Sequence, residues 1–357
     1  MSSFHSDILQ ETKLGQLCGS QKLFRDRYRV LRMIGRGGFG VTFLATDMSL
    51  PGQPLCVIKQ LCPKVSDPPA LAKARKRFER EATILSKLGS HSQIPMLLDY
   101  FVIDGDFFLI QEYIRGITLA RQVRRYGCFS ETAAKRFLRE MLLVLQYVHH
   151  HQVIHRDIKP QNIIRSMEDG RLVLIDFGAV KEEIAQVGDS TMKTPTTQFV
   201  GTMGFAPPEQ FALRPVFGSD IYALGVTCLY LLTKKPPLEF RSDRHTGEIQ
   251  WQNSIELSEP LGKILGKMIK VSLQERYQSV NEILQDLELE SSQDNLAGCL
   301  VNQVPLSKEK TVSSSDKSCS PASKTAIAIR EWKYRKQKKQ RQHKQKKSII
   351  SSSGSSS

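Results

Sequence analysis

The stretch HRDIKPQNIIRSMEDGRLVLIDFG, residues 155–178, brings Asp157, Lys159, Asn162 and Asp176 close together in the chain. Asp157 follows an apolar pattern of helical period, and Asp176 follows the strand-like run Leu172–Ile175. Each carboxylate therefore stands where a predicted element ends. We expect both carboxylates to face a single site.

These residue types suit the transfer of a phosphoryl group. Asp157 can accept the proton of a hydroxyl, while Lys159 neutralises a phosphoryl oxygen. Asn162 and Asp176 offer oxygen ligands of the kind that Mg²⁺ prefers. Two turns without chemistry, one of them Asp-capped, would explain each residue singly but not the order of all four.

The order HRDxKxxN, a strand-like run and then DFG resembles the catalytic loop and the metal-binding loop of protein kinases. The resemblance implies a catalytic role for Asp157 and Lys159 and metal binding by Asn162 and Asp176. It implies ATP and Mg²⁺ as cofactors, with Mn²⁺ as an alternative metal. It also implies an α+β fold of two lobes, a small antiparallel sheet with a helix and a larger helical lobe.

A glycine-rich turn, residues 35–40, lies between two runs of strand-like apolar residues. GxGxxG also occurs in dinucleotide-binding folds, but there a helix follows the glycines, and no helical pattern follows Gly40. The resemblance therefore implies a loop over ATP phosphates, in which Thr42 stands where the family pattern has valine. The residues assigned to ATP binding here are Ile34, Gly35, Arg36, Gly37, Gly38, Phe39, Gly40, Val41 and Thr42.

Lys59 lies in the middle of the apolar run Leu55–Leu61, and a buried ammonium needs a partner. Glu81 falls on the apolar face of a helix predicted over residues 70–88. The two resemble the kinase ion pair that holds a lysine on the α- and β-phosphates; the alternative is a surface lysine and a solvated glutamate.

Residues 97–110 predict two strands around a turn, and the segment that follows resembles the hinge between kinase lobes. The resemblance places the Gln111 side chain at the back of the adenine pocket. It places backbone groups of Glu112 and Ile114 at the adenine edge.

The segment from Asp176 to Glu209 is rich in hydroxyls and resembles an activation segment that ends in GTMGFAPPEQ. Thr202, together with Lys159, resembles the serine/threonine class rather than the tyrosine class. A phosphate on this segment would pair with Arg156. The candidate phosphorylation sites are Thr194, Thr196 and Thr197.

Two further resemblances are structural. Asp220 matches the aspartate of a buried kinase helix that holds the catalytic-loop backbone, although a helix-capping acid would also fit. Arg276 matches the arginine that pairs with Glu209.

The domains expected are an extension, a kinase domain and a basic tail. The chain has 357 residues and a net charge of +15, and residues 303–357 account for +11 of it. Ten Lys/Arg in residues 330–347, with Trp332 and Tyr334, suggest a disordered tail that binds a polyanion, either nucleic acid or anionic membrane; a tail without a partner fits as well. The expected boundaries are 1–26 for the extension, 27–111 and 115–290 for the small and large lobes of a domain spanning 27–290, and 291–357 for the tail.

Seven scattered cysteines without a CxxC pair favour a reducing compartment, and we expect a cytoplasmic protein. The longest apolar run is too short to span a membrane, and the N-terminus has no signal-peptide pattern. The sequence gives no indication of an oligomeric state.

The function expected is that of a bacterial, eukaryote-like serine/threonine kinase, most similar to cyanobacterial members. Its substrates would be proteins, including its own activation segment. The alternative from another class is a pseudokinase scaffold, which would be expected to lack Lys59, Asp157 or Asp176. A small-molecule kinase is disfavoured by the complete segment that seats a peptide.

The substrate is not expected to be strongly basic. Kinases that select arginine carry acids after the hinge and at the end of the central helix, where this chain has Thr118 and Tyr230. Arg115 adds positive charge nearby.

Overall fold

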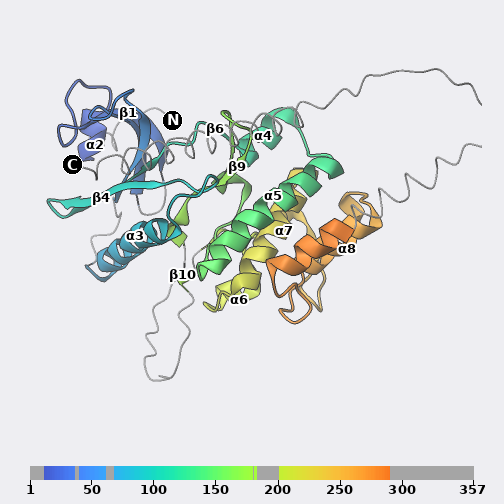
Figure 1. Cartoon of the computed structure of the whole chain (residues 1–357). Coiled ribbons are helices and arrows are strands. Elements are labelled where there is room, and N and C mark those ends of the chain that lie inside the picture. Colours follow the sequence, from blue (N-terminus) through green and yellow to red (C-terminus); the bar gives the residue numbers. More distant parts are fainter. Residues whose placement is uncertain (1–11, 37–39, 62–67, 180, 183–200, 290–357) are drawn as a thin grey trace, which may run out of the picture. The chain divides into compact units, whose positions relative to one another are not determined.

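The computed structural model describes residues 12–36, 40–61, 68–179, 181–182 and 201–289 (Figure 1). Every described residue belongs to the first of two units, residues 1–300 and 301–357. The described part has the expected α+β composition, with an antiparallel sheet first in the chain and a mainly helical part after it.

The small lobe is built on a five-stranded antiparallel sheet of order β1-β2-β3-β5-β4. Asp104 and Gly105 join the last two strands with φ of +51° and +83°, the left-handed pair that a two-residue Asp-Gly hairpin requires. The strands are β1 (Tyr28–Arg36), β2 (Gly40–Asp47), β3 (Leu55–Leu61), β4 (Leu97–Ile103) and β5 (Asp106–Glu112).

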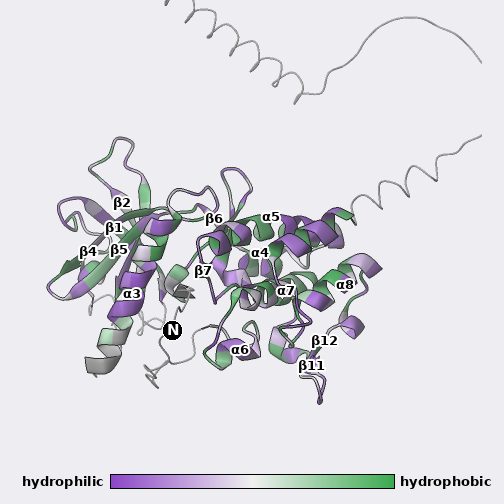
Figure 2. Cartoon of the chain, turned by 60° about the horizontal axis from the view of Figure 1, so that its bottom comes forward, coloured by the Kyte–Doolittle hydropathy of each residue, from purple (hydrophilic) through white to green (hydrophobic). Residues whose placement is uncertain are grey.

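One helix of the small lobe, α3 (Pro68–Leu88), packs against β3, β4 and β5. Its inward stripe holds Ala74, Phe78 and Leu85, all buried at helical spacing as predicted. Most of α3 is hydrophilic in Figure 2, which fits a helix that buries a single stripe. Glu81 lies on the same stripe and is only 4% exposed.

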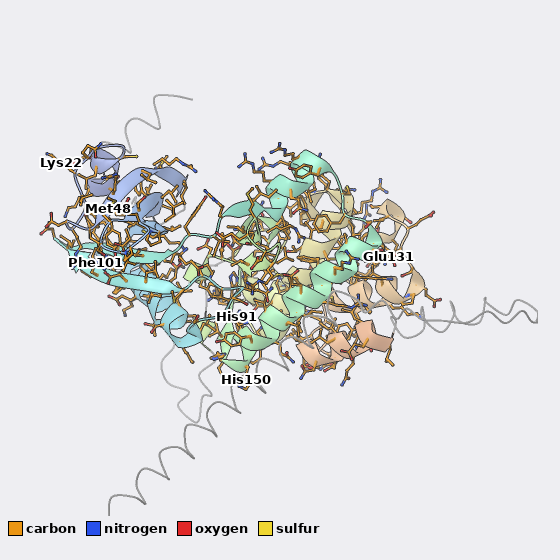
Figure 3. The ribbon with its side chains drawn as sticks, turned by 45° about the horizontal axis from the view of Figure 1, so that its top comes forward. Lys22, Met48, His91, Phe101, Glu131 and His150 are labelled. Atoms are coloured by element: carbon orange, nitrogen blue, oxygen red, sulfur yellow. The ribbon has the colours of Figure 1, made fainter. Side chains whose placement is uncertain are left out.

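The other face of the sheet is covered by residues 12–26, which we expected to be an extension outside the domain. Leu14 of the short helix α2 (Lys13–Leu17) is fully buried, and its N–H donates to Gln60 Oε1 at 3.3 Å. Arg25 lies over the ring of Phe101, labelled in Figure 3, at 4.1 Å. Residues 12–26 therefore pack onto the sheet of the small lobe.

The large lobe is mainly helical (Figure 1). Its helices are α4 (Leu119–Tyr126), α5 (Glu131–His150), α6 (Pro208–Phe211), α7 (Phe217–Thr233) and α8 (Glu259–Met268), and residues 280–289 are also helical. Its short strands are β6 (Gly116–Thr118), β7 (Val153–Ile154), β8 (Ile163–Ser166), β9 (Leu172–Leu174), β10 (Lys181–Glu182), β11 (Arg241–Ser242) and β12 (Ile249–Gln250). Four 3₁₀ turns complete the described elements: η1 (Pro160–Asn162), η2 (Phe177–Ala179), η3 (Pro237–Glu239) and η4 (Gln252–Ser254).

Helix α7 is the buried axis of this lobe and packs against α5 and α8. Its apolar sequence lets it be buried on nearly all sides. At Gly225 a Cβ would lie 2.7 Å from Ile269, so only glycine allows this close approach. Asp220, in the first turn of α7, is the one acid that this buried helix carries.

Helix α5 runs from Glu131 to His150, both labelled in Figure 3, and ends as predicted in a run of histidines. His149 contacts Asp220 at 3.0 Å, whereas His151 contacts the carbonyl of Tyr147. Among the described residues no group of three or more His, Cys, Asp or Glu side chains could hold a metal ion. In the same part of the chain, none of the helices has the length and apolarity needed to cross a membrane.

Candidate active site

Asp157 is the centre of a hydrogen-bond network between the catalytic loop and the end of the activation segment. Thr202 Oγ1 donates to Asp157 Oδ1 at 2.7 Å. Lys159 Nζ donates to Asp157 Oδ2 and to Thr202 Oγ1, both at 2.7 Å. Asn162 Nδ2 also donates to Asp157 Oδ2, at 3.0 Å, and to the Asp157 carbonyl, at 2.9 Å. The carboxylate is therefore held in one orientation.

The loop backbone around this network is strained. Arg156 and Asp176 have φ of +70° and +66°, a region that non-glycine residues rarely adopt. Asp220, fully buried, accepts hydrogen bonds at 2.8 Å from the N–H groups of both His155 and Arg156. These bonds hold the strained turn in place, which is the contact with the catalytic-loop backbone that we predicted for Asp220.

Lys59 lies between two carboxylates. Its Nζ is 2.5 Å from Glu81 Oε1 on α3 and 3.2 Å from Asp176 Oδ1. Burial alone would lower the pKa of Lys59, but the charges of Glu81 and Asp176 outweigh burial and raise it. Lys59 in turn lowers the pKa of Asp176, so both groups stay ionised at neutral pH. The predicted contact between Lys59 and Glu81 is present.

Thr42 and Gln111 lie on the face of the sheet that carries Lys59. Thr42 is paired with Lys59 across β2 and β3, and residues directly opposite each other share a face. Gln111 is 7% exposed and lies two residues beyond Leu109, the partner of Lys59 on β5. Outside the strands, the backbone N–H and C=O of Ile114 form no hydrogen bond to any described residue. Both groups are open to a ligand.

The assignment of Val41 to ATP binding is wrong for its side chain. Val41 is 3% exposed and packs in the apolar cluster on the opposite face, together with Leu14 and Phe24. Successive residues of a strand point to opposite faces, so Thr42 and Val41 cannot both face the nucleotide side.

The glycine-rich turn is described only at its two ends. Gly35 and Arg36 of β1 pair with Thr42 and Val41 of β2, and Ile34, just before them, is 37% exposed. At Gly40 a Cβ would lie 2.5 Å from the carbonyl oxygen of Gln60. The close packing of β2 on β3 therefore requires this glycine. The predictions for Gly37, Gly38 and Phe39 fall outside the described residues.

Asn162 and Asp176 fit a magnesium ion. Asn162 uses its amide nitrogen within the protein, which leaves its carbonyl oxygen for a cation. The Asp176 side chain is 48% exposed, and only its Oδ1 is engaged by Lys59. Mg²⁺ is usually held by one or two protein oxygens together with phosphates and water, so this sparse donor set is sufficient.

The end of the activation segment is anchored by Glu209, as expected. Arg276 Nη1 is 2.7 Å from Glu209 Oε1, and Ser219 Oγ donates to the same oxygen at 2.8 Å. The Arg276 guanidinium also donates to three carbonyls, those of Gly218, Lys270 and Val271. The fully buried arginine is thus satisfied on every side.

Arg156 has the opposite surroundings. It is 7% exposed, its guanidinium donates to no described residue, and its Nε is buried without a partner. Burial and the charge of Arg77 lower the pKa of Arg156 to about 10; Arg80 acts in the same sense, and the charge of Asp220 opposes them. These two arginines of α3 were not among the site residues predicted from the sequence. Their helical spacing could have indicated a shared face, but not the residue that they approach.

The predicted phosphorylation sites Thr194, Thr196 and Thr197 fall outside the described residues. Arg156 of the catalytic loop has two positively charged neighbours on α3, and the described chain resumes at Gly201, just before Thr202.

Comparisons with known proteins agree with this geometry. The protein kinase domain model matches residues 28–287. The chain is 47% identical over 290 residues to serine/threonine-protein kinase B of Synechocystis, covering 80% of this chain and 50% of that protein. It is 43% identical over 271 residues to serine/threonine-protein kinase PknA of Nostoc, covering 75% of this chain and 48% of that protein.

The likeness to cyanobacterial proteins is therefore confirmed, and so is the predicted fold class. The chain spans about half the length of these curated relatives. On the match of the domain model and on the identity to these relatives, the chain belongs to the protein kinase family.

Proposed function

We propose that the chain is a serine/threonine protein kinase, which transfers the γ-phosphate of ATP to serine or threonine hydroxyls of proteins. The observation that carries the proposal is the joint geometry of two groups. Asp157 is oriented by Lys159, Asn162 and Thr202, and Lys59 is fixed between Glu81 and Asp176.

In this proposal Asp157 orients the substrate hydroxyl and accepts its proton. Lys159 already contacts Asp157 and stabilises the phosphoryl oxygens beside it. Lys59 is held charged by its two carboxylates and binds the phosphates of ATP. Glu81 orients Lys59, and Thr202 ties the activation segment to Asp157.

ATP and Mg²⁺ are the cofactors proposed, with Mn²⁺ as an alternative. Bound Mg²⁺ would neutralise charge on the β- and γ-phosphate oxygens. Asn162 and Asp176 would hold the ion with the oxygens that the protein leaves free. The unpaired backbone groups of Ile114 suit the hydrogen-bonding edge of adenine, because such groups seek partners.

A pseudokinase scaffold is the second candidate, and the site does not favour it. Lys59, Asp157 and Asp176 are all present, and each contacts the groups that its catalytic role needs. A scaffold would have no use for a lysine held between two carboxylates next to an oriented aspartate.

The regulation proposed is phosphorylation of the activation segment at Thr194, Thr196 or Thr197. A phosphate there would neutralise Arg156 and its neighbours Arg77 and Arg80, and it would order the segment. Mass spectrometry of ATP-incubated protein should find phosphate in this segment. Fully active protein with an unmodified segment would contradict the proposal.

The basic tail is proposed as a separate anchor to a polyanion. If about five of its cations engage phosphates, affinity should fall with salt at a slope of about −4 to −5 on a double-logarithmic plot for duplex DNA. Deletion of residues 303–357 should abolish retention on heparin and anionic vesicles while turnover of a free peptide is kept. Equal retention of both forms at low salt would contradict the anchor. The cytoplasmic location stays a prediction.

The kinase function is tested by transfer of radiolabelled phosphate from ATP, with Mg²⁺, to a panel of serine and threonine peptides and to the protein itself. Asp157→Asn should lower transfer by about three orders of magnitude or more, because the proton acceptor is lost while the volume is kept. Asp169→Asn is the matched control, since Asp169 is exposed and, within the described residues, interacts only with Arg171 and Ser166 of its own turn. Wild-type turnover by Asp157→Asn would contradict the assignment.

A further inference from the structure

Helix α4 exposes arginines along one side. Val123 lies on the inner side of the helix and is fully buried, whereas Arg121, Arg124 and Arg125 are exposed. Residues three and four apart share a face of a helix, so these three side chains form one row, the α4 arginine stripe.

The stripe has no acidic partner. Within the described residues no carboxylate forms an ion pair with any of its three arginines, and α4 itself carries no acid. Two other helices pair a cation with an acid of their own. On α5, Lys135 Nζ is 2.8 Å from Glu131 Oε1, and α8 has a similar pair one turn apart.

Helix stability does not account for the stripe. Arg124 and Arg125 lie in the last turn of α4, where the helix dipole favours cations. Arg121 lies in the first turn, three residues after the cap Thr118, where the dipole disfavours a cation and glutamate or glutamine is preferred. The charge of Arg121 is therefore unfavourable for the stability of α4.

The stripe begins close to the catalytic loop. Helix α4 packs against η1, and Thr118 is paired across β6 and β8 with Ile164, two residues beyond Asn162. Strand β6 itself also contacts η1, of which Asn162 is the last residue. Arg121 follows three residues after Thr118, so an extended peptide covers the path from Asn162 to the stripe in about three to six residues.

We propose that the α4 arginine stripe binds acidic residues of the protein substrate, placed about three to six residues from the phosphorylated hydroxyl. The inference rests on the kinase function proposed above and names its substrate class. Arginine recognises carboxylates through two parallel hydrogen bonds, and three exposed arginines that have no acidic partner among the described residues offer several such contacts, although Arg125 also lies over the ring of Tyr126. Arg115, also exposed, adds a fourth positive charge at the approach to α4. Because the stripe lies outside the Asp157 network, it should govern substrate affinity rather than the rate of transfer.

The test compares three peptides that share one serine and carry three glutamates, three glutamines or three lysines within six residues of it. Wild-type protein should have a KM for the glutamate peptide about three- to tenfold below that for the glutamine peptide, with similar kcat. The lysine peptide should be the poorest substrate. The double variant Arg121→Gln/Arg124→Gln should remove the advantage of glutamate, as should 0.5 M salt, which screens exposed charges (Debye length about 4 Å).

Arg136→Gln is the matched control, because Arg136 is an exposed arginine of α5 and should leave the glutamate preference intact. Equal kcat/KM for the glutamate and glutamine peptides would overturn the inference while the kinase function stands. An undiminished preference in the double variant would do the same. Absence of transfer to every peptide and to the protein itself would overturn the proposed function and this inference together.

Discussion

Arg276 and Arg156 are both buried in the large lobe, yet their surroundings are opposite. Arg276 donates to Glu209 and to three backbone carbonyls. Arg156 donates to no described residue and lies in the field of Arg77 and Arg80, which together with burial lowers its pKa to about 10. A buried charge is costly unless it is paired. The first arginine therefore completes a structure, whereas the second lacks an anion that must come from elsewhere.

The largest effect is expected at Lys59, a partly buried cation that is paired like Arg276 but belongs to the active site. Lys59→Met should lower phosphate transfer by about three orders of magnitude or more, because the charge held for the phosphates is lost. Single-turnover transfer with saturating ATP measures the loss. A variant with near-normal transfer would show that Lys59 is a structural cation only.

At Arg276 the expected loss is in stability. Arg276→Met should lower the free energy of unfolding by about 3–5 kcal/mol, because it leaves Glu209 and several carbonyls without their donor. Urea unfolding followed by tryptophan fluorescence gives the value. Arg276→Lys should fall between the variant and wild type, since one ammonium cannot replace the planar fork.

At Arg156 the effect of the same substitution on the free energy of unfolding should be absent or of opposite sign. In protein treated with phosphatase, Arg156→Met should leave the free energy of unfolding unchanged or raise it by about 1 kcal/mol, because it removes a buried charge that donates to no anion and for which burial and Arg77 outweigh the attraction of Asp220. The same urea experiment applies. A loss as large as that of Arg276→Met would mean that the two arginines are equivalent, and the comparison would fail.

His91 is a third group whose charge has unfavourable surroundings, and its effect on stability should be the smallest. Burial and the nearby charges of Arg171 and His151 lower its pKa, and its Nδ1 accepts a hydrogen bond from Gln93 N–H that protonation would break. The folded state thus binds fewer protons, and stability should fall as pH drops below about 6.5, the pKa of unfolded histidine. His91→Asn should make the loss of stability between pH 7 and pH 5.5 smaller. The difference should be a fraction of 1 kcal/mol, about 0.5 kcal/mol, since solvent screens the partly exposed ring. An unchanged slope would exclude His91 as its source.

Much of the active site could be predicted because its parts are local in sequence. Lys59 in an apolar strand and Glu81 on an apolar helix stripe each needed a partner, and the structure pairs them. Asp157 and Asn162 are only five residues apart, so one loop places both. Among the described residues, the side chain of Val41 was assigned to the wrong face, because consecutive residues of a strand point to opposite faces.

Other features depend on how distant elements meet, and no local pattern reports that. Arg77 and Arg80 reach Arg156 only because α3 lies beside the catalytic loop. Residues 12–26 contain a helix of five residues with Leu14 as its only large buried side chain, too short for a periodic signal. Their place on the sheet depends on an apolar surface that the strands form only after folding.

The most direct test of the account is the turnover of one peptide before and after the activation segment is phosphorylated, in wild-type protein and in Arg156→Met. Phosphatase-treated wild type should gain about tenfold or more in turnover after incubation with ATP, since one new charge-assisted contact of about 1.4 kcal/mol suffices for a tenfold shift. Arg156→Met should carry the same phosphate by mass spectrometry without the gain. Equal gains in both proteins, or full activity of the unmodified wild type, would contradict the claim that Arg156 awaits an anion.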